Sequence, residues 1–307
     1  MDTPIFFWIL FNAFVLLMLA LDLGVFHRKT HEVSLKEALT WTIIWVCLAL
    51  IFNAIIFYWK GRQQALEFFT GYLVEKALSV DNIFVFIMIF TYFQIPSKYQ
   101  HKVLFWGILG ALLMRVIFIF AGVALIEKFH FTIYIFGALL IYTGYKMFYH
   151  NNAKILPDKN PLIRFFKKFM PVTPHLQEDN FFVKLNVKRY AIPLFLVLIL
   201  IETTDLIFAV DSIPAILAIT QDQFIVYTSN VFAILGLRSL YFALAGVVHR
   251  FLLLSFGLAI VLVFVGIKML LIDIYKIPIE WSLIFIATII TGSIFLSLKI
   301  KRTNSVM

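Results

Sequence analysis

Long apolar stretches separated by short polar breaks dominate the chain. A helix that crosses the hydrocarbon of a bilayer needs about 20 mostly apolar residues, and this length predicts about nine transmembrane helices. The expected spans are 5–26, 38–59, 68–93, 103–125, 131–149, 190–219, 224–248, 254–275 and 279–298. The pattern therefore predicts an all-α polytopic membrane protein whose main surroundings are the lipid bilayer.

The composition excludes an ordinary soluble protein. Of the 307 residues, 62% are hydrophobic and only 14% are charged, whereas soluble domains carry roughly 25% charged residues. Cys47 is the single cysteine, so a disulfide within the chain and a thiolate metal cluster are both excluded.

The formal net charge of +9 is explained by membrane orientation. If the N-terminus lies outside, the outer segments carry only Lys60, Arg62, Lys128 and Lys276, and most other Lys and Arg residues lie in the inner segments. Because inner loops are enriched in Lys and Arg, we expect the N-terminus outside and the C-terminus in the cytoplasm. No nucleic-acid partner is needed to explain the basic charge.

Parts of the sequence occur twice. Val80-Asp81-Asn82-Ile83 is repeated as Val210-Asp211-Ser212-Ile213, and a second carboxylate lies six residues before each aspartate, at Glu75 and at Asp205. Ile108-Leu109-Gly110 corresponds to Ile234-Leu235-Gly236, and the surroundings of Gly144 correspond to those of Gly266. The order is kept through three consecutive spans, which indicates an ancient duplication.

Each copy contains an odd number of spans, so the second copy is expected to be inverted in the membrane. Inverted repeats are typical of transporters and place the binding site near the middle of the bilayer. The expected organisation is two accessory helices in 1–62, a first three-helix repeat in 63–149, a basic cytoplasmic connection in 150–189, a second repeat in 190–276, and a final helix with a basic tail in 277–307.

Five carboxylates lie deep in the predicted spans: Glu75, Asp81, Glu202, Asp205 and Asp211. Each costs about 2.5–3.5 kcal/mol or more at the bilayer centre, so each calls for a reason. Oxygen ligands favour Mn²⁺, Mg²⁺ or Ca²⁺ over Zn²⁺ or Cu⁺. Further neutral oxygens are available from Asn82, Thr203, Thr204 and Ser212.

The surplus of acids over the charge of one divalent ion predicts exchange of metal for protons, because metal entry displaces protons from crowded carboxylates. Simple ion pairing with Lys76, Arg115 or Arg238 is the alternative. Residues six apart on a straight helix point about 120° away from each other. Convergence of Asp205 and Asp211 therefore requires a break, which we expect at Pro214.

Two segments resemble the signatures of the TerC integral membrane family. They are Glu75-Lys-Ala-Leu-Ser-Val-Asp81-Asn82-Ile-Phe and Glu202-Thr-Thr-Asp205-Leu-Ile-Phe-Ala-Val-Asp211-Ser212-Ile-Pro214-Ala. The whole chain, including Ser-Asn-Val-Phe-Ala-Ile-Leu-Gly-Leu-Arg238, is similar to the Alx-like branch of that family. The resemblance implies a bacterial inner-membrane manganese exporter, with relatives tied to tellurium resistance, calcium handling and metal supply to exported enzymes. It also implies that the five acids are the metal ligands.

Three alternatives remain open beside Mn²⁺ export. One is Ca²⁺/H⁺ exchange, and a second is a membrane scaffold that supplies metal to exported enzymes, with protein-translocation or metalloenzyme partners. An intramembrane hydrolase is disfavoured, because the sequence contains neither G-x-G-D nor H-E-x-x-H. We therefore expect a protein that is not an enzyme, with no permanently bound cofactor and with Mn²⁺ as the transported ion.

Overall fold

The computed structural model describes residues 3–24, 33–149, 181–185, 188–245, 253–275 and 277–304, and it is almost entirely helical. The helices before residue 150 are α1 (Ile5–Gly24), α2 (Leu35–Lys60), α3 (Arg62–Tyr92), α4 (Ser97–Lys128) and α5 (Thr132–Tyr149). Those that follow are α7 (Pro193–Leu217), α8 (Gln223–Leu235), α9 (Leu237–Ala245), α10 (Leu254–Leu270) and α11 (Ile279–Asn304).

The all-α membrane architecture is confirmed. In the described part of the chain, five helical stretches are long and apolar enough to cross a membrane: Leu35–Lys60, Ser97–Lys128, Pro193–Leu217, Gln223–Ala245 and Ile279–Ser297. Three shorter apolar helices join them, at Ile5–Ala20, Thr132–Phe148 and Leu254–Leu270. The 31-residue α3 is equally long but is interrupted by Glu75, Lys76 and Asp81.

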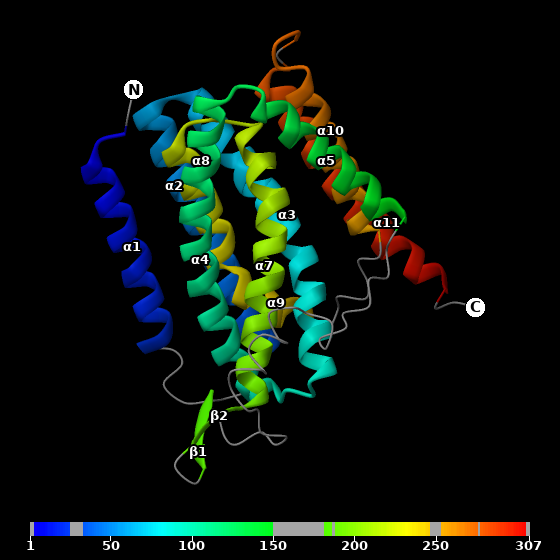
Figure 1. Ribbon diagram of the computed structural model, residues 1–307. Coiled ribbons are helices and arrows are strands. Elements are labelled where there is room, and N and C mark those ends of the chain that lie inside the picture. The colour runs from blue at the N-terminus through cyan, green and yellow to red at the C-terminus, as the bar shows by residue number, and fades with distance from the viewer. Residues whose placement is uncertain are drawn as a thin grey trace.

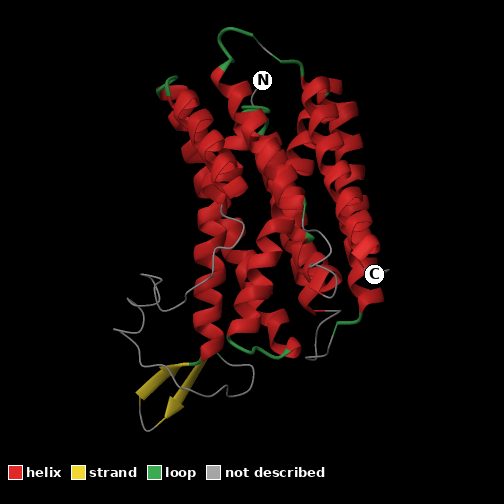
Figure 2. Cartoon of the chain, turned by 90° about the vertical axis from the view of Figure 1, so that its right-hand side faces the viewer, coloured by secondary structure: helices red, strands yellow, loops and turns green. Residues whose placement is uncertain are grey.

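The helices stand side by side in one bundle, and the N-terminus lies at one end of it (Figures 1 and 2). Helix α3 packs against α2, α7 and α8, and α4 packs against α7 and α8. Helices α5, α10 and α11 form a separate group beside this centre, in which α10 lies between the other two (Figure 1). The bundle therefore joins helices from both predicted repeats at its middle.

Local signals in the sequence explain several helix ends. Gly61 adopts φ = 102° between α2 and α3, a conformation that only glycine adopts readily. Asp222 caps α8, where its Oδ1 accepts hydrogen bonds from the backbone N–H groups of Phe224 and Ile225 at 3.0 and 3.2 Å. Pro193 occupies the first turn of α7, where a proline removes no helical hydrogen bond.

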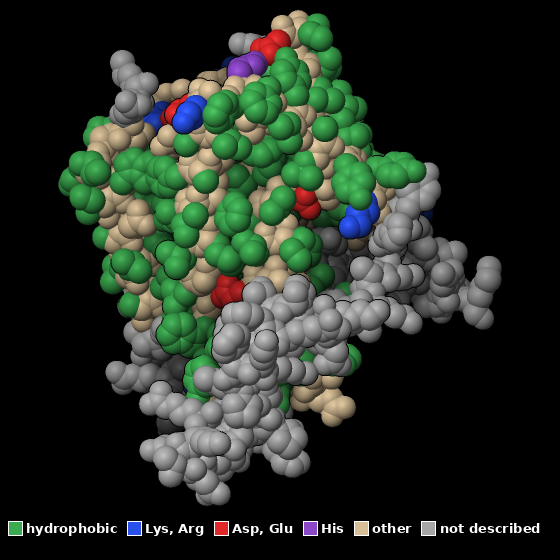
Figure 3. Space-filling model, in the orientation of Figure 1, with side chains coloured by type: hydrophobic (Ala, Val, Ile, Leu, Met, Phe, Trp, Pro, Cys, Tyr) green, Lys and Arg blue, Asp and Glu red, His purple; other side chains and the backbone are tan. Residues whose placement is uncertain are grey.

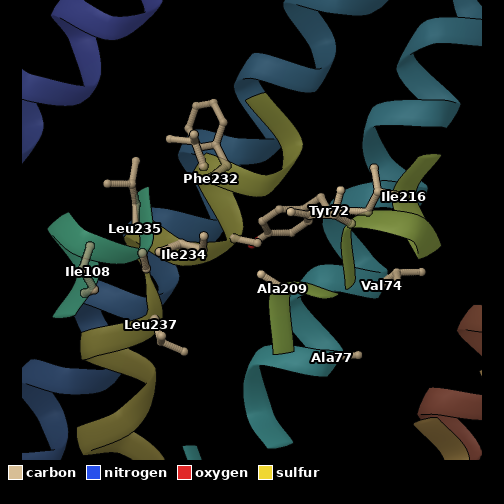
Figure 4. Close-up of a cluster of buried hydrophobic side chains, with 14 of the residues drawn as sticks. Tyr72, Val74, Ala77, Ile108, Ala209, Ile216, Phe232, Ile234, Leu235 and Leu237 are labelled. Atoms are coloured by element: carbon tan, nitrogen blue, oxygen red, sulfur yellow. The ribbon is translucent and has the colours of Figure 1, made fainter. Parts of the chain in front are cut away.

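The core of the bundle is mainly apolar. Figure 4 shows buried side chains from α3, α4, α7, α8 and α9 in one cluster, with Tyr72, Ile108 and Phe232 among them. The outer face shown in Figure 3 is mainly hydrophobic and is interrupted by a few charged side chains of both signs and a histidine. Large apolar side chains such as Leu113 and Ile117 of α4 are exposed, as expected of a surface that faces lipid.

Two details differ from the sequence-based expectations. The predicted span 224–248 is divided at Gly236, where α8 ends and α9 begins. The predicted connection 150–189 overlaps an unexpected antiparallel hairpin of β1 (Phe182–Leu185) and β2 (Lys188–Ala191), in which Phe182 pairs with Ala191. Residues 150–180 and 186–187 of that connection lie outside the described residues.

Candidate functional site

Two of the predicted acids are buried near the same arginine inside the bundle. Glu75 of α3 is 0% exposed and Asp205 of α7 is 4% exposed. Arg115 of α4 is 1% exposed, and its Nη2 lies 2.7 Å from Oε1 of Glu75. We call Glu75, Asp205 and Arg115, together with the amides Asn82 and Asn230 that contact them, the central cluster.

The two amides complete the central cluster from α3 and α8. Nη1 of Arg115 donates a hydrogen bond to Oδ1 of Asn230, and Nδ2 of Asn82 donates to Oδ1 of Asp205 at 3.4 Å. The charges of Arg115 and Glu75 also act on the Asp205 carboxylate. Four helices, α3, α4, α7 and α8, therefore contribute to one polar network within the apolar core.

Several atoms of the central cluster are not satisfied. Among the described residues, Oε2 of Glu75, Oδ2 of Asp205 and Nε of Arg115 are buried and have no hydrogen-bond partner. An unsatisfied buried polar group costs about 1–3 kcal/mol. Asp205 also lines a cavity of about 10 Å³ between α4, α7 and α9, which is the size of a single water molecule. The carboxylates therefore have ligand capacity that the protein itself does not use.

Glu202 lies one helical turn before Asp205, and its half-buried side chain reaches across to α4. Its carboxylate lies against Gly110, where a β-carbon would overlap it. The ammonium of Lys76, in contrast, turns toward α8 and donates to the carbonyl of Ala233 at 3.1 Å. The glycine of α4 thus provides the space for this third acid.

Asp211 faces a different neighbour from Asp205. The hydroxyl of Thr143, on α5, donates to Oδ1 of Asp211 at 2.9 Å. Helix α7 runs without interruption from Pro193 to Leu217, so the expected break at Pro214 is wrong. A continuous helix turns Asp205 and Asp211 about 120° apart, which places Asp211 toward α5 and not in the central cluster.

The remaining predicted residues differ in how the structure places them. Asp81 lies in α3, but its side chain is outside the described residues. Ser212 is buried, and its hydroxyl has no partner among the described residues. The hydroxyls of Thr203 and Thr204 donate to the carbonyls of Ile199 and Leu200 in their own helix, at 2.6 and 2.9 Å.

The acids whose side chains are described are not gathered into one metal cage. Across the described ranges, no three His, Cys, Asp or Glu residues lie close enough together to hold a metal ion. The sequence indicates Arg115 only as one of several possible counter-charges and assigns no role to Asn230. The signal for Asn230 was available, because a buried amide in the apolar run of α8 requires a hydrogen-bond partner.

A sequence model of the integral membrane protein TerC family matches residues 60–305. The chain belongs to the TerC family. The match begins at the end of α2, so it includes the central cluster, Glu202 and Asp211, and leaves all of α1 and most of α2 outside. Together with the apolar helices, it identifies an integral multi-pass membrane protein.

Bacterial relatives in the TerC family share most of the chain. An uncharacterized membrane protein of Myxococcus xanthus is 54% identical over 295 residues, covering 96% of this chain and 92% of its own length. The Escherichia coli K12 relative bears the name Alx, given as that of a proposed membrane-bound redox modulator; it is 50% identical, with 92% and 90% covered. A Rickettsia bellii membrane protein is 45% identical, with 96% and 98% covered. No solved structure matches.

Proposed function

We propose that this protein transports a divalent metal cation across the bacterial inner membrane, with Mn²⁺ export as the most specific form of the proposal. The observation that carries it is the burial of Glu75 and Asp205 around the same arginine, Arg115, inside a membrane bundle. Buried carboxylates within membrane spans mark ion or proton pathways, and the two acids retain oxygens that no described protein group satisfies. The family resemblance supports manganese and the outward direction.

The packing of the helices supports an inverted 3+3 repeat within nine spans. Under the duplication, α3 corresponds to α7, the α8–α9 pair to α4, and α10 to α5. The contact of α4 with α7 then has its counterpart in the contact of α8 with α3, and both are present. Contacts between small residues follow the same correspondence. Gly137 lies against Gly266, and Gly144 lies against Ala259. Because the repeat matches Gly144 with Gly266 and Gly137 with Ala259, these two contacts are counterparts of each other.

Transport by rocking of one repeat against the other fits the positions of the acids on α7. Glu202, Asp205 and Asp211 follow one another along this helix, and 1.5 Å of rise per residue spaces the first and last by about 13 Å. The ion passes from one carboxylate to the next, and a site with three ligands forms only when the helices move. Asp81, Asn82, Ser212, Thr203 and Thr204 are the further candidate ligands.

Proton exchange completes the proposal. A carboxylate that releases a metal ion into a water-poor interior gains stability from protonation, so each transported cation is exchanged for protons. The N-terminus lies outside and the C-terminus in the cytoplasm, and no cofactor is permanently bound. Exported metalloenzymes or the protein-translocation machinery are partners of the alternative scaffold function.

The experiment is metal flux into proteoliposomes that contain only the purified full chain. Mn²⁺, Ca²⁺, Mg²⁺ and Zn²⁺ are offered separately, with a fluorescent metal indicator and a pH dye in the lumen. We expect Mn²⁺ to enter fastest and the lumen to become more alkaline as protons leave. Faster Ca²⁺ entry would favour Ca²⁺/H⁺ exchange.

The absence of flux for every cation, in vesicles whose protein is folded and inserted, would contradict transport. Metal binding without flux would favour the scaffold that supplies metal to exported enzymes. A redox role, as the name of the Alx relatives suggests for those proteins, predicts sensitivity to thiol modification at Cys47, which is exposed. Cys47→Ser is therefore the control variant, and transport by carboxylates predicts unchanged flux in it.

A further inference from the structure

The guanidinium of Arg115 links the acidic centre to the second repeat. Nη2 contacts Glu75 of α3 at 2.7 Å, Nη1 donates to Asn230 of α8, and the charge of Asp205 of α7 acts on the same group. The guanidinium of Arg115 on α4 is thereby attracted to α3 and α7, the first helices of the two repeats, and is hydrogen-bonded to α8. It occupies Oε1 of Glu75, one of the oxygens that a transported cation would bind.

We propose that Arg115 is a built-in competitor of the transported cation. Its guanidinium holds Glu75 while the centre is free of metal, and an entering divalent ion binds Glu75 only by displacing it. The return of Arg115 then promotes release of the ion. This inference rests on the proposed cation transport and assigns to Arg115 the control of affinity and release.

Charge disfavours simultaneous occupation of Glu75 by a divalent ion and the guanidinium. Arginine remains protonated in proteins, so its charge cannot be removed by the reaction and only its position can change. Like charges a few ångströms apart in a poorly hydrated interior repel strongly.

The position of Arg115 has no cationic counterpart in the second repeat. Gly110 corresponds to Gly236, so the position equivalent to Arg115 is Tyr241, whose hydroxyl donates to Oε1 of Gln100 at 2.9 Å. The buried arginine of the second repeat, Arg238, lines the cavity beside Asp205 instead, so the two halves of the duplicated centre place their cations differently. We therefore expect Arg115 to favour release of the metal in the conformation in which its contact with Glu75 is restored.

Removal of the tethered charge should separate metal binding from turnover. In Arg115→Gln we expect the dissociation constant for Mn²⁺ to fall at least about tenfold, because a nearby like charge shifts such equilibria by about one to three powers of ten. The maximal flux should fall by a similar factor, because release becomes slow. Tighter binding with slower turnover is expected when a group that destabilises the bound state is removed. A purely structural role of Arg115 would not produce this pattern.

The control is Lys60→Gln, which breaks the ion pair between Lys60 and Asp222, 2.6 Å apart at one end of the bundle. Its Mn²⁺ affinity should equal that of the wild type. Arg115→Lys keeps the charge but loses the planar fork that reaches two partners at once, so its affinity should rise less than that of Arg115→Gln. Arg115→Lys decides the matter if Arg115→Gln does not fold.

The test uses the full chain, with Mn²⁺ binding followed by electron paramagnetic resonance in detergent and Mn²⁺ flux followed in proteoliposomes. Tighter binding with slower flux in Arg115→Gln supports the inference. Unchanged or weaker binding in folded Arg115→Gln, or in Arg115→Lys if only that variant folds, overturns it when the wild type binds and transports Mn²⁺. If the wild type neither binds nor transports any divalent cation, the proposed function itself fails.

Discussion

Arg115 and Glu75 form an ion pair of 2.7 Å in which both side chains are almost completely buried, at 1% and 0% exposure. Burial of two charges costs several kcal/mol per ion, and their attraction recovers this only with good geometry and further hydrogen bonds. Asn230 supplies one such bond, while Oε2 of Glu75 receives none from the described residues. Disruption of this ion pair should therefore change the free energy of unfolding measurably.

Removal of one partner should destabilise the fold more than removal of both. Glu75→Gln leaves the buried guanidinium without its ion-pair partner, and breaking a buried ion pair costs about 3–5 kcal/mol. The double variant Glu75→Gln/Arg115→Gln leaves two neutral amides and should be more stable than Glu75→Gln alone. Denaturant unfolding in detergent, followed by circular dichroism, measures both. If the double variant is as unstable as the sum of the two single variants, the pair is not energetically coupled.

Gly110 should matter for transport more than for stability. A β-carbon at residue 110 would overlap the carboxylate of Glu202. Because that carboxylate is the far end of a flexible side chain, it can move aside, so Gly110→Ala should fold. We expect its Mn²⁺ flux to fall by about tenfold or more, since an Å-scale displacement of a functional group has effects of that order.

The matched control for Gly110→Ala is Gly292→Ala. Gly292 lies in α11, and a β-carbon there would meet nothing within 4 Å. Flux in Gly292→Ala should equal that of the wild type in the same vesicle assay. Equal flux in both variants would mean that the position of Glu202 against α4 has no role in transport.

Asp211 should be required for flux although it lies apart from the central cluster. Asp211→Asn removes the charge that Thr143 contacts at 2.9 Å, and we expect Mn²⁺ flux to be lost in a folded protein. Thr143→Val keeps the charge and should reduce flux only a few-fold, the usual scale for one lost hydrogen bond. Asp81→Asn should behave as Asp211→Asn does, because the two aspartates are repeat counterparts. Wild-type flux in Asp211→Asn would remove it from the pathway.

The duplicated packing of α5 and α10 gives a prediction about stability. A β-carbon at Gly266 would lie 2.7 Å from the carbonyl oxygen of Gly137, and one at Gly144 would lie 2.8 Å from that of Ala259. Because both obstacles are backbone, Gly266→Ala and Gly144→Ala should each destabilise the protein by about 1–3 kcal/mol. Denaturant unfolding should give similar losses for the two. A large loss in only one of them would argue against equivalent positions.

The spans could be predicted from the sequence because the bilayer imposes a length on every apolar helix, and α2, α4 and α11 satisfy that length clearly. The acids could be found because a charge in an apolar run is conspicuous. The partner of each acid could not be found in this way. Arg115 is 40 residues from Glu75, and Asn230 is 115 residues from Arg115, so their contacts depend on which helices pack together.

Helix geometry also explains what failed. Convergence of Asp205 and Asp211 requires a break at Pro214, yet Pro214 lies three residues from the end of α7 and the helix is continuous past Asp211. The hydropathy pattern does not predict the division between α8 and α9 at Gly236. The residues on both sides of Gly236 are apolar, and such a pattern does not distinguish one helix from two.

The most direct measurement is Mn²⁺ flux through Asp205→Asn in proteoliposomes, compared with Asp273→Asn. Asp205 is buried between the two repeats, whereas Asp273 is 48% exposed beyond the end of α10. Both substitutions remove one negative charge with almost no change in shape. We predict that flux is abolished in Asp205→Asn and unchanged in Asp273→Asn. Wild-type flux in folded Asp205→Asn would contradict the claim that the buried carboxylates carry the metal.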